Sequence, residues 1–392
     1  MPRNLPPPLM NPVWPTMRDD KRPSCVFIVG DGFTQGFLRA TELNDKIKCT
    51  IDDLIPAPPE VEYIPIQGDR FERGSLWDEE KWPKIFEYYN EVGLSGRDFF
   101  QSLPSSNINE TREKEFWNFG YSSFAFELRW YIWHFFHYIN SKVTAEQKKK
   151  IPDDWGWLSV LYLLISEFRF SSISFNYDIF LDRILYTTIG QVTKSWRGTP
   201  DQRMISPVEK KEVSLLDSPA GSILMLKPHG SIAHQLRSDI VFGAGTNPWL
   251  VNLTLEDTQM IGIQTEYKLD LSDLQYSFFP DLVPPGRPGT DRISPYSHAL
   301  GFSGEVLNYA DLVVICGLSG EEPDKDEVTD LLSEIRDEAI VIQVGLKRYG
   351  DDENNVANVI KSKKKYKFFD AAEVLSICQL IKNNFTLRWT WK

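Results

Sequence analysis

The sequence has few cysteines, and those it has lie far apart. Its 392 residues include four, Cys25, Cys49, Cys316 and Cys378, and no two of them form a Cys-x-x-Cys pair. Zinc modules and disulfide frameworks need closely spaced cysteines, so we expect neither of these, and no bound metal. Each cysteine is instead expected to be a small, buried apolar residue.

Positive charge is scarce relative to negative charge. The chain has 43 Lys and Arg residues against 55 Asp and Glu residues, which gives a formal net charge of −12. A protein that binds nucleic acid by itself needs a basic face to neutralise phosphates. Direct nucleic-acid binding is therefore not expected.

No segment has the composition of a membrane span or of a signal peptide. The most apolar stretch, "FWNFGYSSFAFELRWYIWHFFHYI" at 116–139, is interrupted by Glu127 and Arg129, so it predicts a buried aromatic helix and no membrane contact. The first residues, "MPRNLPPPLMNPVWPTMRDDKRP", lack the apolar centre of a signal peptide. We expect a proline-rich arm at 1–23, either disordered or in contact with a partner, and a cytoplasmic protein.

Short, continuous apolar segments alternate with helical patterns along the chain. Such buried strands indicate a parallel sheet with helices on both faces, a Rossmann-like, doubly wound α/β fold. Ligands of these folds bind at the carboxyl ends of the strands, so the residues after each strand are the candidate site. The predicted strands are 25–29, 172–175, 223–226, 312–316 and 339–344.

The gaps between these strands predict two insertions in one core. The core is expected at 24–55, 156–234 and 305–392. The segment 56–155 is too long for an ordinary crossover and contains the aromatic stretch, so we expect a mostly helical insertion there. The segment 235–304 is rich in Pro, Gly, Asp and Ser and predicts a loop-rich insertion.

Glycines follow the first predicted strand, in the sequence "GDGFT". Glycines at this point let backbone N–H groups approach a pyrophosphate at the N-terminus of the next helix. The same pattern fits an NAD(P)-dependent oxidoreductase, for which Asp52 has the spacing of a ribose contact. It also fits a tight turn that holds no ligand.

Polar residues follow the second strand, where "FNYD" places Asn176 and Asp178 two positions apart. Two side chains at this spacing leave a strand on the same side, so both are able to point at one ligand. Asp178 is equally suited to be the N-cap of the helix that follows.

The third strand is followed by His229 and Gly230, and the fourth by Gly317 and Ser319. A histidine at a strand end suits acid–base chemistry because its ordinary pKa lies near neutrality, although a structural histidine has the same pattern. Gly317 and Ser319 predict another loop in contact with a phosphate or a ribose of the ligand.

In this order, the motifs Gly-x-Gly-Phe-Thr, Phe-Asn-Tyr-Asp, His-Gly-Ser and Gly-Leu-Ser resemble the Sir2-like fold. They are most similar to the divergent prokaryotic Sir2-like proteins of anti-phage defence. The resemblance implies that NAD+ is the substrate and that Asn176, Asp178 and His229 are catalytic. It places the NAD+ contacts at Gly30, Asp31, Gly32, Phe33, Thr34, Gly230, Gly317 and Ser319.

The sequence departs from the protein-deacylating sirtuins in two ways. Asp31 stands where they have alanine, and their four zinc cysteines are absent. We therefore expect an NAD+ glycohydrolase that releases nicotinamide and ADP-ribose, held in check by a homo-oligomer or by a partner encoded nearby, such as an ATPase or an Argonaute-like protein. A non-catalytic nucleotide-binding or assembly subunit and an oxidoreductase are the alternatives. On the first hypothesis, Asn176, Asp178 and His229 converge on the turn at Gly30.

Overall fold

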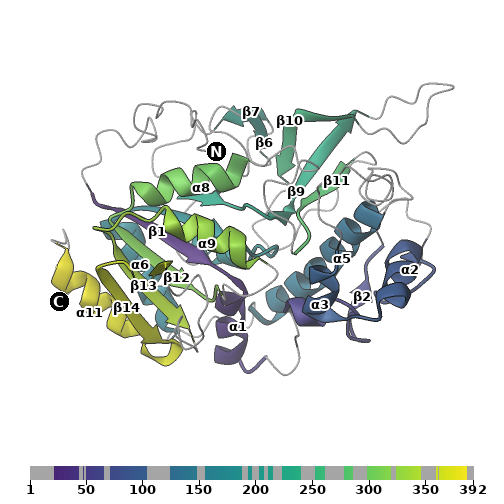
Figure 1. Cartoon of the computed structure of the whole chain (residues 1–392), viewed down its shortest axis with the longest axis horizontal. Helices are drawn as coiled ribbons and strands as arrows, with labels where there is room; N and C mark the ends of the chain where they lie inside the picture. The colour runs from purple at the N-terminus through teal and green to yellow at the C-terminus, as the bar shows by residue number, and fades with distance from the viewer. Residues whose placement is uncertain are drawn as a thin grey trace.

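A parallel sheet of seven strands forms the core of the α/β fold, as a computed structural model shows; β1, β12, β13 and β14 are labelled in Figure 1. The strands lie in the order β14-β13-β12-β1-β4-β8-β5, and every neighbouring pair is parallel. Their bounds are β1 Ser24–Val29, β4 Arg169–Ser174, β5 Thr193–Trp196, β8 Ile223–Leu226, β12 Leu312–Cys316, β13 Ile340–Gly345 and β14 Lys365–Asp370. The predicted α/β class is confirmed.

The structure describes part of the chain. The described residues are 22–43, 47, 50–65, 71–103, 124–147, 155–187, 193–196, 203–206, 211–214, 223–239, 252–260, 278–285, 298–318, 324–345, 359–360 and 362–385. The predicted arm at 1–23 lies almost entirely outside them.

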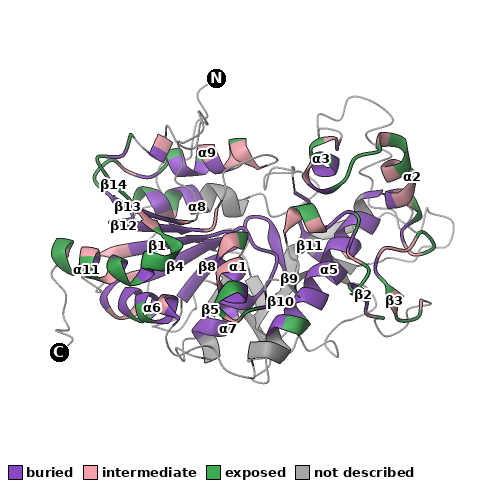
Figure 2. Cartoon of the chain, turned by 90° about the horizontal axis from the view of Figure 1, so that it is seen from below, coloured by how far each residue is buried: buried purple, intermediate pink, exposed green. Residues whose placement is uncertain are grey.

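Helices cover both faces of the sheet (Figure 2). Helices α1 Asp31–Ala40, α6 Gly156–Glu167, α7 Phe180–Thr187 and α11 Val374–Asn384 lie on one face, and α8 His298–Asn308 and α9 Lys325–Ser333 lie on the other. Side chains of β1 alternate between the two cores: Phe27 packs on the α1 side, while Val26 and Ile28 pack on the α9 side.

The direction of the chain creates a topological switch point beside β1. From β1 the chain continues through α1 and the insertion to β4 on one side, whereas β12, on the other side, continues through α9 to β13. The loops after β1 and β12 therefore diverge to opposite faces. In doubly wound sheets this switch point is where ligands bind.

A mostly helical segment lies between β1 and β4. It contains η2 Ile51–Asp53, β2 Glu62–Tyr63, β3 Gly74–Ser75, α2 Pro83–Val92, α3 Gly96–Gln101 and α5 Phe124–Gln147. The aromatic stretch forms much of α5, whose Tyr131 hydroxyl donates to the Leu54 carbonyl (2.6 Å). Its residues share one continuous core with β1 and α6. No helix in the described ranges has the length and apolarity of a membrane span.

A second sheet includes two strands from the segment that the sequence predicts to be loop-rich. Its strands β6 Arg203–Ser206, β7 Lys211–Ser214, β9 Gly230–Asp239, β10 Asn252–Met260 and β11 Phe278–Leu282 lie in the order β11-β9-β10-β6-β7. Strands β10 and β11 fall within 235–304. The short alternating pattern of "NLTLEDTQM" is a strand signal that the surrounding Pro and Gly residues obscure.

Candidate active site

The turn between β1 and α1 packs directly on the loop after β12. The Gly30 N–H donates to the Cys316 carbonyl (2.9 Å), and the Gly32 N–H donates to the Gly317 carbonyl (3.1 Å). A Cβ atom on Gly32 would lie 2.6 Å from the Gly317 Cα, and Gly317 itself has a φ of +65°. Glycine is therefore required on both sides of this contact, because any side chain would separate the two loops.

These contacts differ from the phosphate contacts that the sequence suggests. The N–H groups of Gly30 and Gly32 bind carbonyl groups of the protein itself. Phe33 is 1% exposed, and its ring packs against Phe27 and Trp155 (centroids 5.6 and 5.5 Å). Phe33 and the two N–H groups therefore stabilise the turn. Beside them, Asp31 is exposed at the N-terminal end of α1.

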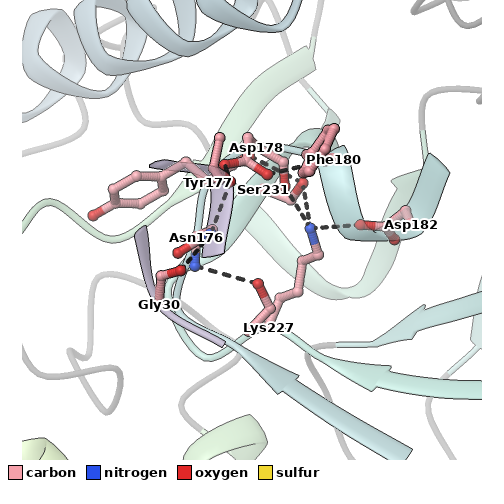
Figure 3. A network of polar contacts seen from close by, with 10 residues as sticks. Gly30, Asn176, Tyr177, Asp178, Phe180, Asp182, Lys227 and Ser231 are labelled. Carbon is pink, nitrogen blue, oxygen red and sulfur yellow. Dashed lines mark hydrogen bonds and ion pairs between the residues drawn. The ribbon is translucent and has the colours of Figure 1, made fainter. Parts of the chain in front are cut away.

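Asn176 and Asp178 meet this turn from the end of β4 (Figure 3). The Asn176 side-chain amide donates to the Gly30 carbonyl (3.0 Å), and the Thr34 hydroxyl donates to Asp178 Oδ2 (2.9 Å). Asp178 Oδ1 accepts from the N–H of Phe180 (2.9 Å), the first residue of α7. Both side chains are buried, at 8% exposure each. Asn176 therefore contacts Gly30 itself, and Asp178 contacts Thr34 in the first turns of α1.

Two carboxyl groups near the turn have raised pKa values. Burial raises the pKa of Asp178, and the nearby Lys227 and two hydrogen bonds partly oppose this. Desolvation by the surrounding protein raises the pKa of Asp31 to about 6, the Gly32 N–H and Arg97 oppose it, and Asp178 and Asp52 add to it. Asp31 is nonetheless exposed to solvent. It is an accessible carboxyl group that titrates near neutrality.

A buried ion pair, which the sequence did not predict, joins helix α7 to the loop after β8 (Figure 3). Lys227 Nζ lies 3.0 Å from Asp182 Oδ2, and both side chains are 1% exposed. The same ammonium group donates to the Asp178 carbonyl (2.8 Å) and to the Ser231 hydroxyl (3.3 Å). A lysine directly after a buried apolar strand, in "LMLKPHGSI", is the sequence signal for this pair.

His229 lies next to the same strand end but turns toward α9. Its ring packs on Phe175 and Tyr177 (centroids 5.3 and 6.4 Å), the two neighbours of Asn176 in the chain. Its Nε2 is 2.9 Å from Glu327 Oε1, and the two side chains are 2% and 7% exposed. Within the described ranges no hydrogen bond joins the imidazole to Asn176 or Asp178. The structure therefore places His229 beside these residues, in a separate polar contact.

The remaining predicted positions have simpler roles. Gly230 has a φ of +78° and its N–H donates to the Lys227 carbonyl (2.9 Å), which closes the turn that carries His229. Ser319 lies outside the described residues. Asp52 Oδ1 accepts from the Arg97 N–H (3.2 Å) at the start of α3. In the described ranges no group of three His, Cys, Asp or Glu residues is placed to hold a metal ion.

Comparisons with known proteins give likenesses to solved structures. No family model matches the chain, and no curated protein matches it. Among solved structures, one described as "Structural Basis for the Mechanism and Regulation of Sir2 Enzymes" is 12% identical, with 93% of each chain covered and a TM-score of 0.30. A likeness at this level does not assign the chain to a family.

Proposed function

We propose that the protein is an NAD+ glycohydrolase. The observation that carries the proposal is the group of buried polar side chains, Asn176, Asp178 and His229, at the carboxyl ends of β4 and β8 beside the β1–α1 turn. In a doubly wound sheet this edge next to the switch point is the expected nucleotide site. The reaction joins water to the ribose of NAD+ and releases nicotinamide, ADP-ribose and a proton.

The movement of charge during the reaction determines which side chains would assist it. As the bond between nicotinamide and ribose stretches, positive charge moves from the ring to the sugar, so a nearby carboxylate stabilises the transition state. Asp178 is the carboxylate in this proposal, and Asn176 orients the ribose and the attacking water. His229 accepts a proton from that water or from a ribose hydroxyl. The pyrophosphate would lie at the N-terminus of α1, where the helix dipole favours negative charge.

Replacing His229 with alanine tests this function. We expect nicotinamide release to fall by about a hundred- to ten-thousand-fold, because a general base typically contributes that much. Free nicotinamide would be measured by chromatography after purified protein is mixed with NAD+. Lys382→Met, an exposed change on α11, is the control for handling and folding. Undiminished turnover in the His229 variant would remove the imidazole from the mechanism.

A non-catalytic nucleotide-binding subunit is the second candidate. It is favoured by the internal hydrogen bonds of Asp178, whose two carboxylate oxygens both accept from the protein itself. Such a subunit would bind NAD+ and release no nicotinamide. An oxidoreductase would instead produce reduced cofactor, which absorbance detects in the same mixture when a reducible or oxidisable partner is added.

Asp31 makes NAD+ affinity depend on pH. Above its pKa of about 6 the carboxylate is charged and repels a pyrophosphate at the α1 N-terminus, whereas below that pH it is neutral. We expect Asp31→Asn to bind NAD+ about threefold more tightly than the wild type at pH 8, and equally well at pH 5. Calorimetric titration at both pH values measures this. Glu60→Gln, an exposed change in the insertion, should leave both affinities unchanged.

We further propose that the activity is restrained in the resting cell and serves anti-phage defence. An unrestrained NAD+ hydrolase would empty the cell of its cofactor, so a homo-oligomer or a partner must control it. Expression alone and with neighbouring genes, followed by the nicotinamide assay, tests this. Activity that appears only in the joint preparation supports control by a partner.

A further inference from the structure

The contact between His229 and Glu327 crosses the carboxyl edge of the sheet. His229 follows β8 and Glu327 lies in the first turn of α9, which follows β12. In the sheet order, β1 and β4 stand between β12 and β8. The pair therefore links the two sides of the switch point, across the strand ends that carry Gly30 and Asn176.

Several contacts fix the position of His229. The His229 carbonyl accepts from the Val283 N–H (2.9 Å), and the adjacent Gly230 N–H closes a turn on Lys227. The rings of Phe175 and Tyr177 pack against the imidazole, and Glu327 meets its Nε2 at 2.9 Å. A carboxylate next to one ring nitrogen selects the tautomer and ring orientation that a catalytic histidine uses.

Glu327 brings a carboxyl group to the N-terminal end of α9. It lies in the first turn of α9, where the helix dipole favours negative charge. An ionised carboxylate accepts a hydrogen bond and donates none, so the proton between the two groups belongs to Nε2 of the imidazole.

We propose that Glu327 is the positioning residue of His229. It keeps the proton on Nε2, so that Nδ1 exchanges protons with the ligand. The proposal rests on the proposed NAD+ hydrolysis: an N–H bond forms at Nδ1 as an O–H bond of water or ribose breaks, and the Glu327 carboxylate stabilises the resulting imidazolium. Glu327 itself does not touch the substrate in this scheme.

The tautomer can be measured without any turnover. In full-length protein labelled with ¹⁵N-histidine at pH 8, we expect His229 to show a protonated Nε2 and a bare Nδ1. The chain has five histidines, so the signals that His229→Gln removes assign the residue. In Glu327→Gln we expect this single tautomer to be lost. A bare Nε2 with a protonated Nδ1 in the wild type would overturn the proposal.

Kinetics then separate a positioning role from a structural one. Glu327→Gln is expected to lower kcat for nicotinamide release about a hundred-fold while KM for NAD+ changes by less than about threefold, since only the proton-transfer step is affected. Glu327→Asp should restore part of kcat because it restores the charge. Asp330→Asn, an exposed change on the same helix, is the matched control.

The outcomes distinguish the two proposals. If the wild type releases no nicotinamide but His229 has the expected tautomer, NAD+ hydrolysis fails and the pairing of the two residues stands as structure only. If the wild type is active and Glu327→Gln retains full kcat, Glu327 is not a positioning residue although the proposed function holds. A fall in the melting temperature alone, with kcat unchanged, would also reject the positioning role.

Discussion

Replacing Lys227 with methionine is expected to lower the free energy of unfolding by about 3–5 kcal/mol. Both partners of the Lys227–Asp182 pair are 1% exposed. Removal of the ammonium group leaves a buried carboxylate without its counter-charge, and desolvating an unpaired charge is costly. The loss would be measured by urea unfolding followed by far-ultraviolet circular dichroism.

A double variant separates the charge from the loss of packing. Lys227→Met combined with Asp182→Leu should recover most of the lost stability, because apolar residues of similar size replace a buried ion pair at little cost. Lys382→Met, on the exposed side of α11, should change stability by less than about 0.5 kcal/mol. If the two single changes were simply additive in the double variant, the pair would not be the source of the effect.

The Lys227–Asp182 pair also bears on how the loops of the candidate site are positioned. Lys227 Nζ contacts the carbonyl of Asp178 and the hydroxyl of Ser231 as well as Asp182. It thus ties the loop that carries Asn176 to the loop that carries His229. The double variant keeps the fold but loses these hydrogen bonds, so nicotinamide release by that protein would report how far the site depends on them.

The strands that sequence alone predicts are those in the middle of the sheet. β1, β8, β12 and β13 are short and largely apolar, β4 mixes apolar residues with serines, and each appears close to its predicted place. The edge strands β5 "TKSW" and β14 "KYKFFD" were missed. An edge strand exposes one side and carries charged residues that discourage pairing with other chains, so its sequence lacks the continuous apolar signal.

Some residues of the candidate site could likewise be predicted from local sequence, and others could not. Asn176, Asp178 and His229 follow strands, so their place at the carboxyl edge could be predicted from local sequence. Glu327 could not, because it is 98 residues from His229 and meets it only through the order of strands in the sheet. Which residues face each other across an edge depends on topology, and no local pattern contains that information.

The glycines after β1 show a different limit of prediction from sequence. The Gly-x-Gly pattern predicts that another group comes close to the backbone at Gly30 and Gly32. It does not identify that group. Backbone carbonyl groups of the β12 loop and phosphate oxygens both accept from the same N–H groups, so the pattern has the same form for either. Only the position of Gly317, fixed by the parallel pairing of β1 with β12, identifies the carbonyl groups as the partners.

The same substitution at two glycines should therefore have opposite effects. In Gly30→Ala the new Cβ would overlap the Gly317 carbonyl oxygen and lie 2.8 Å from the Leu318 Cα, and both are backbone atoms that cannot rotate away. We expect unfolding free energy to fall by about 3 kcal/mol, because the two loops must separate.

Gly36, inside α1, has nothing within 4 Å of the position of an added Cβ. Gly36→Ala should raise stability by about 1 kcal/mol, since alanine is the better helix former. Urea unfolding of both variants measures the difference. If Gly30→Ala were as stable as Gly36→Ala, the contact between the two loops would not hold the turn on which the candidate site is built.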